Sequence, residues 1–243
     1  ATYGGKLNKW TYQVGVRAES VSVSALANET RTGEVTKFPF DNDYFQLYPS
    51  FYVTYTKNDK NSYQLSYSRR IDRPGIGQVN PIKEWSTPLV SSYGNQKLLP
   101  QFTNSVEVNY TRRLKKGTIT SGVFYRAISD EINRALYVDK SDVQSGRVIL
   151  THDNFDDTSA FGMELSSNYK PTTWWSFNSS FDLFSQTQEG VAEYINVPLK
   201  QATPDNVIRS INVVDNVAWN FRMFNSFSAS KTLSFTAFMF YRG

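Results

Sequence analysis

Residues that could perform chemistry are few in this chain of 243 residues. It contains no cysteine and one histidine, His152, which excludes thiol nucleophiles, thiolate metal sites and histidine-rich metal clusters. The acidic stretch 152–157 (HDNFDD) could hold Ca²⁺, but it lacks the spacing and glycine of an EF-hand, so a solvated acidic loop is favoured. Gly75-Ile-Gly77 precedes no helical pattern and does not predict a phosphate-binding loop. We find no catalytic constellation and predict no enzyme activity, metal site or cofactor.

Charged side chains offer two further candidates. Arg69, Arg70 and Arg73 follow one another closely and could bind an anion by bidentate contacts, although structural pairing with neighbouring segments is favoured. Isolated acidic residues such as Glu107 and Glu164 could resemble glycosidase carboxylates, but each lies in an otherwise polar row and fits a water-lined wall better. The net charge of +4 is too small to indicate nucleic acid as a partner.

The elements that carry these side chains are strands. The chain has 37 aromatic residues among 243, yet its mean hydropathy is −0.47, because apolar residues occupy alternate positions. In segment 62–71, Tyr63, Leu65 and Tyr67 form one row, whereas the residues between them are polar. This period of two is that of a strand, and it recurs along the chain. Helical spacing is limited to one short turn after Thr203. The sequence therefore predicts an all-β protein.

The connections between strands alternate between long and short. We expect nine strands, at residues 8–26, 44–56, 62–72, 102–113, 118–129, 159–170, 174–186, 217–229 and 232–241. The long connections are 27–43, 73–101, 130–158 and 187–216, and the short ones are 57–61, 114–117, 171–173 and 230–231. An antiparallel up-and-down sheet would place all short turns on one rim, which is typical of a transmembrane β-barrel. A soluble sandwich or propeller also alternates apolar and polar residues, and it stays as an alternative.

A motif-rich stretch between residues 63 and 110 narrows the choice. A strand ends in Arg69-Arg70-x-x-Arg73-Pro74, followed by Asn80-Pro81, then Gly94-Asn95-x-x-Leu98-x-Pro100, and then the next strand. This order resembles the barrel domain of TonB-dependent receptors, in particular the outer-membrane β-barrel family abundant in Bacteroidota. Weaker similarities, such as Leu47-Tyr48-Pro49-Ser50, extend over nearly the whole chain. Gln96 and Gln101 depart from the family pattern, which usually has Pro and Glu there.

The resemblance implies a transporter of the bacterial outer membrane. Such receptors have barrels of 22 strands with an N-terminal plug, and they take up iron chelates, cofactors, peptides or glycans with energy relayed by TonB. Residues 1–243 would then be part of a single barrel domain, with the plug and remaining strands outside this chain. The odd number of nine strands also predicts an incomplete barrel, since single-chain bacterial barrels have even numbers. Partners would be membrane lipid, TonB through the plug, and a surface lipoprotein or other complex subunits.

Site residues follow from this interpretation. We expect external-loop contacts with a ligand from Arg73, Trp85, Tyr93 and Tyr137. We expect a polar lumen wall from Arg17, Glu107, Glu164, Asp182 and Arg222. Two alternative functions stay open: a non-transporting outer-membrane barrel that serves as a scaffold or surface component of a secretion or assembly complex, and a soluble β-rich adhesin or binding module.

Overall fold

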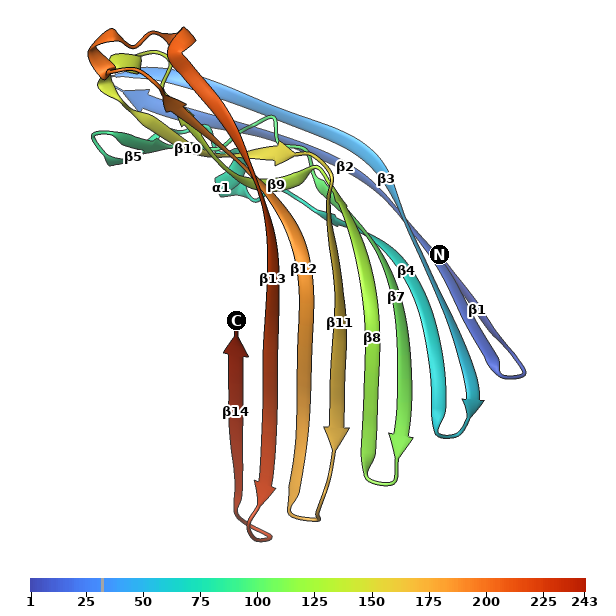
Figure 1. The fold of residues 1–243 in the computed structure, drawn as a ribbon. Coiled ribbons are helices and arrows are strands. Elements are labelled where there is room, and N and C mark those ends of the chain that lie inside the picture. The colour runs from blue at the N-terminus through green and yellow to red at the C-terminus, as the bar shows by residue number, and fades with distance from the viewer. Residues whose placement is uncertain (32) are drawn as a thin grey trace.

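A computed structural model describes residues 1–31 and 33–243 and confirms the all-β prediction (Figure 1). Ten strands of the described chain pair with their sequence neighbours into one antiparallel wall. They are β1 (Thr2–Leu7), β2 (Trp10–Arg31), β3 (Glu34–Asn58), β4 (Asn61–Asp72), β7 (Gln101–Leu114), β8 (Gly117–Ser129), β11 (Thr158–Tyr169), β12 (Trp175–Ile195), β13 (Val207–Ser228) and β14 (Ser234–Arg242). The short turns lie at one rim, as predicted, and the longer connections at the other.

The wall of the described chain has one strand more than the nine that we expected for the chain, and four further strands lie in the loop region. Residues 8–26 were predicted as the first strand, but β1 precedes them and forms a hairpin with β2 through a turn at Asn8, whose φ is 53°. Gly4 and Gly5 concealed β1 because glycine has no side chain to continue the alternation. The ring of Tyr12 on β2 covers Gly5, where a Cβ atom would lie 2.6 Å from the phenolic oxygen. The wall is open, with β1 and β14 at its edges, but an odd strand number is not the reason.

Two of the predicted long loops are mostly strand. Segments 27–43 and 187–216 continue the ladders of β2–β3 and β12–β13, up to Arg31↔Glu34 and Ile195↔Val207. At about 3.3 Å per residue, a 22-residue strand such as β13 measures roughly 70 Å. A tilted bilayer crossing needs only about 9–11 residues. These four strands therefore extend well past the length that a membrane requires.

The other two long loops fold into a small sheet of their own. Its strands are β5 (Glu84–Thr87), β6 (Val90–Ser92), β10 (Val148–Phe155) and β9 (Glu131–Val138), in that spatial order, and we call it the loop sheet. It joins the wall where Val191 of β12 pairs with Ala135 of β9. The acidic stretch 152–157 is thus largely part of β10 and not the solvated loop that was expected.

Four single-turn helices among the described residues complete the loop region. They are α1 (Ile76–Val79), η1 (Val143–Ser145), η2 (Leu199–Gln201) and η3 (Pro204–Asn206). The turn predicted after Thr203 is confirmed by η3, whereas α1 falls where no helical pattern was found. The buried apolar clusters also lie in this region: one contains Ala135, Phe155 and Val191, and another contains Val138, Val143 and Ala202. The packed apolar clusters of the described chain therefore lie mainly in the loop region, although single buried residues such as Tyr48 and Phe124 lie on the wall.

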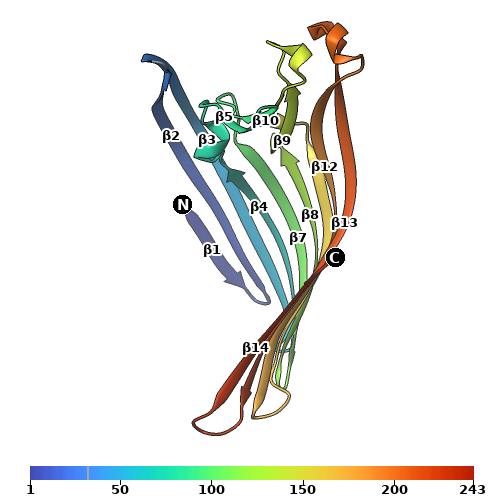
Figure 2. The ribbon, with the colours of Figure 1, turned by 90° about the vertical axis from the view of Figure 1, so that its left-hand side faces the viewer.

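Strand pairing sorts the wall into two faces. Trp10, Tyr55, Tyr63 and Tyr110 are successive partners across four strands, and the ring centroids of Trp10 and Tyr55 are 4.8 Å apart. Such an aromatic row near the turn rim is typical of a membrane interface. Figure 2 shows that the wall is curved and twisted. Within the described residues, no helix is long and apolar enough to cross a bilayer.

Candidate functional site

The segment between β4 and β7 is anchored to the wall at Arg73. Its guanidinium forms an ion pair with Glu19 of β2 and donates a hydrogen bond of 2.5 Å to the hydroxyl of Tyr44 on β3. Both partners belong to the extended hairpin β2–β3, so Arg73 joins the segment between β4 and β7 to that hairpin. The structural pairing favoured for this arginine cluster is confirmed for Arg73.

The motif residues Asn80, Gly94 and Asn95 hold the loop together. Gly94 N–H donates to the Asn80 carbonyl at 2.6 Å, and Asn95 N–H donates to the Gln78 carbonyl at 2.7 Å. A Cβ atom on residue 94 would lie 2.4 Å from the backbone nitrogen of Asn80, so only glycine allows this approach. The Asn95 side chain then donates to the His152 carbonyl at 3.2 Å. The motif thus joins α1 to the loop sheet.

A second set of hydrogen bonds ties β10 to the same segment. The Asn154 side chain accepts from Leu99 N–H at 2.8 Å and donates to the Leu99 carbonyl at 3.0 Å. The neighbouring Leu98 is only 1% exposed. Because these contacts join residues about 55 positions apart, they fix the placement of the two loops relative to each other.

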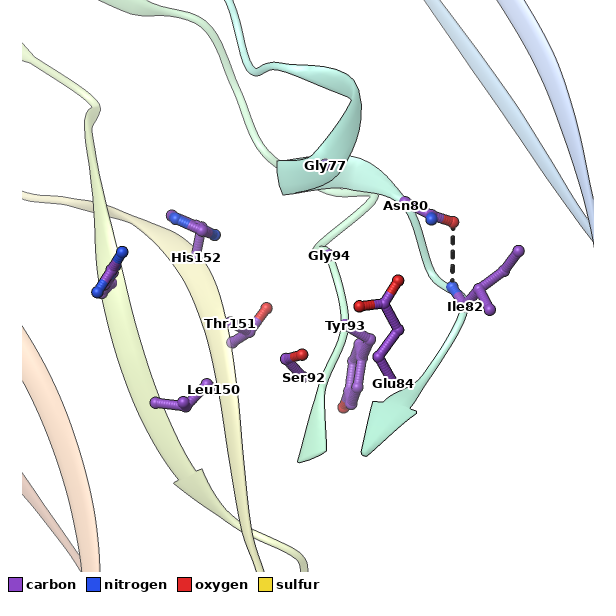
Figure 3. Close-up of a pocket in the computed structure, with 11 residues that line it drawn as sticks. Gly77, Asn80, Ile82, Glu84, Ser92, Tyr93, Gly94, Leu150, Thr151 and His152 are labelled. Atoms are coloured by element: carbon purple, nitrogen blue, oxygen red, sulfur yellow. Dashed lines mark hydrogen bonds between the residues drawn. The ribbon is translucent and has the colours of Figure 1, made fainter. Parts of the chain in front are cut away.

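A cavity of about 390 Å³ lies between these anchored segments (Figure 3). Its walls come from α1 and the residues after it, from β5 and β6, and from β9 and β10. The residues that line it are Gly77, Asn80, Ile82, Glu84, Ser92, Tyr93, Gly94, Arg134, Leu150, Thr151 and His152. This volume lies within the range of small-molecule sites in proteins.

Strand register explains how polar groups reach the cavity. Glu84 pairs with Ser92, Ser92 pairs with Leu150, and Arg134 pairs with His152 two residues further along β10. Side chains directly opposite each other share a face of a sheet, as do side chains two residues apart. One face of the loop sheet therefore carries a carboxylate, a hydroxyl, an imidazole and a guanidinium.

Several of these groups have no partner within the chain. In the described residues, neither the Glu84 carboxylate nor the Arg134 guanidinium forms an ion pair or side-chain hydrogen bond. The Thr151 hydroxyl is buried without a hydrogen-bond partner, in a residue 8% exposed. Burial, and then the positive charge of Arg134, lower the pKa of His152, so its ring is neutral at neutral pH. The cavity thus offers the charged groups of Glu84 and Arg134 to a ligand.

The predicted ligand contacts are distributed over several places. Tyr93 lines the cavity. Trp85 lies on β5 with Lys83 Nζ 4.5 Å and Arg147 Cζ 5.4 Å from its ring centre. Tyr137 donates a hydrogen bond of 2.5 Å to Asp153, and burial together with this carboxylate raises the pKa of Tyr137 to about 12. The structure therefore brings one of the four predicted residues to the cavity, while Arg73, Trp85 and Tyr137 have partners in the chain.

Sequence reasoning missed Glu84, Arg134 and Thr151. The sequence pattern predicts one long loop at residues 130–158, whereas the structure has the hairpin β9–β10 there, with Arg134 and His152 as a facing pair. The available signal was the apolar alternation of Ala135, Tyr137 and Ile149, which is short and interrupted by the turn at Gly146.

The predicted lumen residues share the polar face of the wall. Arg222 donates to Asp182 at 2.8 Å, and Arg126 lies 3.6 Å from Glu164. Glu107 accepts a hydrogen bond of 3.1 Å from Ser105. Arg17 lies 3.1 Å from Glu19 on the same strand. Their positions in the register put all five predicted residues, Arg17, Glu107, Glu164, Asp182 and Arg222, opposite the aromatic row. That this face lines a lumen stays a prediction.

Comparison with known protein families explains the β-strand wall. The model of the outer membrane protein beta-barrel family matches residues 1–243. The chain belongs to this family. Its place is therefore the bacterial outer membrane, which excludes the soluble adhesin, and the family is not one of enzymes. No curated protein matches this outer-membrane barrel chain in sequence. A specific origin in Bacteroidota stays a prediction.

Solved receptor structures share the fold of this outer-membrane barrel chain. The siderophore receptor PirA from Pseudomonas aeruginosa matches with a TM-score of 0.52 and 13% identity over 95% of this chain and 45% of that chain. The Serratia marcescens hemophore receptor HasR, in complex with HasA and heme, matches with a TM-score of 0.58 and 13% identity over 96% of this chain and 43% of that chain. The copper transporter OprC matches with a TM-score of 0.53 and 10% identity over 97% of this chain and 45% of that chain. The chain spans less than half the length of these structures.

Proposed function

We propose that this chain forms part of the wall and outer loops of a TonB-dependent receptor that takes up a scarce nutrient. The observation that carries the proposal is the combination of a receptor-like wall with a cavity of unused polar groups among the long connections. In this proposal, residues 1–243 belong to a single barrel domain, and a plug domain and further strands complete the receptor.

The chemistry of the two faces supports passage along the polar one. The face opposite the aromatic row carries carboxylates and guanidinium groups in the pairs Arg222–Asp182 and Arg126–Glu164. A wet wall of this kind hydrogen-bonds both to water and to a plug that occupies the barrel. The loop sheet, at the rim opposite the tight turns, would select the ligand before TonB drives its passage.

Uptake in cells tests the proposal. Cells that express the full-length protein are compared with a deletion strain and with a strain lacking TonB, using iron chelates, heme, copper salts and short peptides as labelled probes. We expect uptake of one probe class to be lost in both the deletion strain and the strain without TonB. If uptake of every probe is unchanged while a surface complex fails to assemble, the proposal is wrong and the scaffold alternative is favoured.

A further inference from the structure

The cavity has opposite charges at its two sides. Glu84 lies on β5 and Arg134 on β9, the outer strands of the four-stranded loop sheet, and both line the cavity. Adjacent strands lie about 4.8 Å apart, so the backbones of β5 and β9 are separated by roughly 14 Å. Both side chains line the cavity, so a ligand whose own charges lie roughly 10–14 Å apart can meet both of them.

The middle of the cavity is partly apolar and holds the Ser92 hydroxyl. Leu150 and Ile82 contribute apolar surface, and Tyr93 adds an aromatic ring. Figure 3 shows Thr151 and Ser92 between His152 on one side and Glu84 on the other, with the Thr151 hydroxyl pointing toward the segment that contains Gly94. A buried hydroxyl without a partner is uncommon in native structures. The Thr151 oxygen is closed to solvent, however, and its side chain lies on the face of β10 opposite to Leu150 and His152, so a ligand would meet the Ser92 hydroxyl instead.

We propose that this cavity binds a short zwitterionic peptide of about two to four residues, since an extended chain advances about 3.3–3.6 Å per residue. The peptide ammonium group contacts Glu84, the terminal carboxylate contacts Arg134, and a backbone group hydrogen-bonds to Ser92, which lies on the same face between them. This inference rests on the proposed function for its biological role, because it names the substrate class that the receptor would capture.

Other ligand classes fit the charges less well. A purely anionic ligand would meet Arg134 but would also face the Glu84 carboxylate, and like charges repel at such a distance. A neutral sugar would displace water from both charged groups without offering either an ionic partner, which is unfavourable. The neutral His152 ring repels neither end of a zwitterion. A peptide satisfies both charges at once.

Blocked peptides test which end is recognised. Binding of trialanine, N-acetyl-trialanine and trialanine amide to the detergent-solubilised full-length protein is measured by calorimetry. Each blocking group removes one charge, so we expect either blocked peptide to bind about 10- to 100-fold more weakly than trialanine. Equal affinity for all three peptides, or no binding of any of them up to about 10 mM, would overturn the proposal.

Two variants assign each end to its residue. Glu84→Gln should remove the affinity penalty that acetylation causes but keep the one that amidation causes. Arg134→Gln should do the opposite. The matched controls Asp59→Asn and Lys200→Gln remove exposed charges outside the cavity and should leave both penalties unchanged. If both cavity variants keep both penalties, the peptide binds elsewhere and the proposal is wrong.

The binding assay requires neither TonB nor transport, so the two proposals can fail separately. Peptide binding without uptake in cells would contradict the receptor function and leave the cavity assignment intact. TonB-dependent uptake of another probe, together with no peptide binding, would contradict the cavity assignment alone.

Discussion

The wall and the loop sheet are both β-structure, but they are specified in different ways. Wall strands pair with their sequence neighbours, and their pairing follows from alternating side chains and tight turns. The loop sheet instead has parallel pairs, β6 with β10 and β9 with β12, between segments far apart in the chain. Its placement depends on individual polar contacts, such as Asn95 with His152 and Glu193 with Val138 N–H at 3.1 Å. Regular patterning therefore builds the wall, and a few side chains build the site.

The tight-turn rim of the wall and the loop region should lie on opposite sides of the outer membrane's apolar layer. The chain has no cysteine, so single cysteines can be introduced at Asp59, in a tight turn, and at Lys200, in the loop region. We expect an impermeant thiol reagent added to intact cells to label Lys200→Cys and not Asp59→Cys. After the outer membrane is permeabilised, both should react. Labelling of Asp59→Cys alone in intact cells would reverse the orientation.

The two faces of the wall should differ strongly in their tolerance of charge. Val108 lies on the same face as the aromatic row, and its neighbour Asn109 lies on the polar face. Val108→Arg should lower the free energy of unfolding by about 2–4 kcal/mol if the site lies near the bilayer midplane. Asn109→Arg, the matched control, should cost far less. Equal effects in a folding titration in lipid vesicles would mean that the faces are assigned wrongly.

The loop region should respond to a single methyl group at Gly94. Gly94→Ala places a Cβ atom against the backbone of Asn80, and overpacking of this kind costs about 1–3 kcal/mol. We expect faster proteolysis of segment 73–100 while the wall stays folded. Gly75→Ala is the control, because its Cβ atom would lie 3.7 Å from the nearest atom, at Gln78. If both variants resist protease equally, the Gly94 contact does not hold the loop.

The smallest expected effect is on how the stability of the turn between β9 and β10 depends on pH. The hydrogen bond from the Ser141 hydroxyl, at 2.5 Å, together with nearby Lys83, lowers the pKa of Asp139. A carboxyl whose pKa is lower in the folded state stabilises that state above its ordinary pKa of 3.8. This contribution is lost as the pH falls through the lower folded value.

Hydrogen exchange of segment 139–147 checks this pH dependence. We expect protection to decrease between about pH 5 and pH 3 in the unmodified protein and to change less in Asp139→Asn. Asp142→Asn serves as control, since that carboxylate is half-exposed and lies 3.7 Å from Arg147. A decrease of the same size in all three proteins would show that Asp139 does not contribute.

The sequence by itself determined the strand architecture, the tight turns and the polar and apolar faces, because a period of two and a turn are properties of adjacent residues. It missed β1, where Gly4 and Gly5 interrupt that period. It also made the strands of the hairpins β2–β3 and β12–β13 too short at their outer ends. Only the tertiary structure brought Glu84, Thr151 and Arg134 around one cavity with Tyr93. Those residues lie on four separate segments, and their meeting depends on long-range contacts at Gly94, Asn95 and Asn154 that no local pattern encodes.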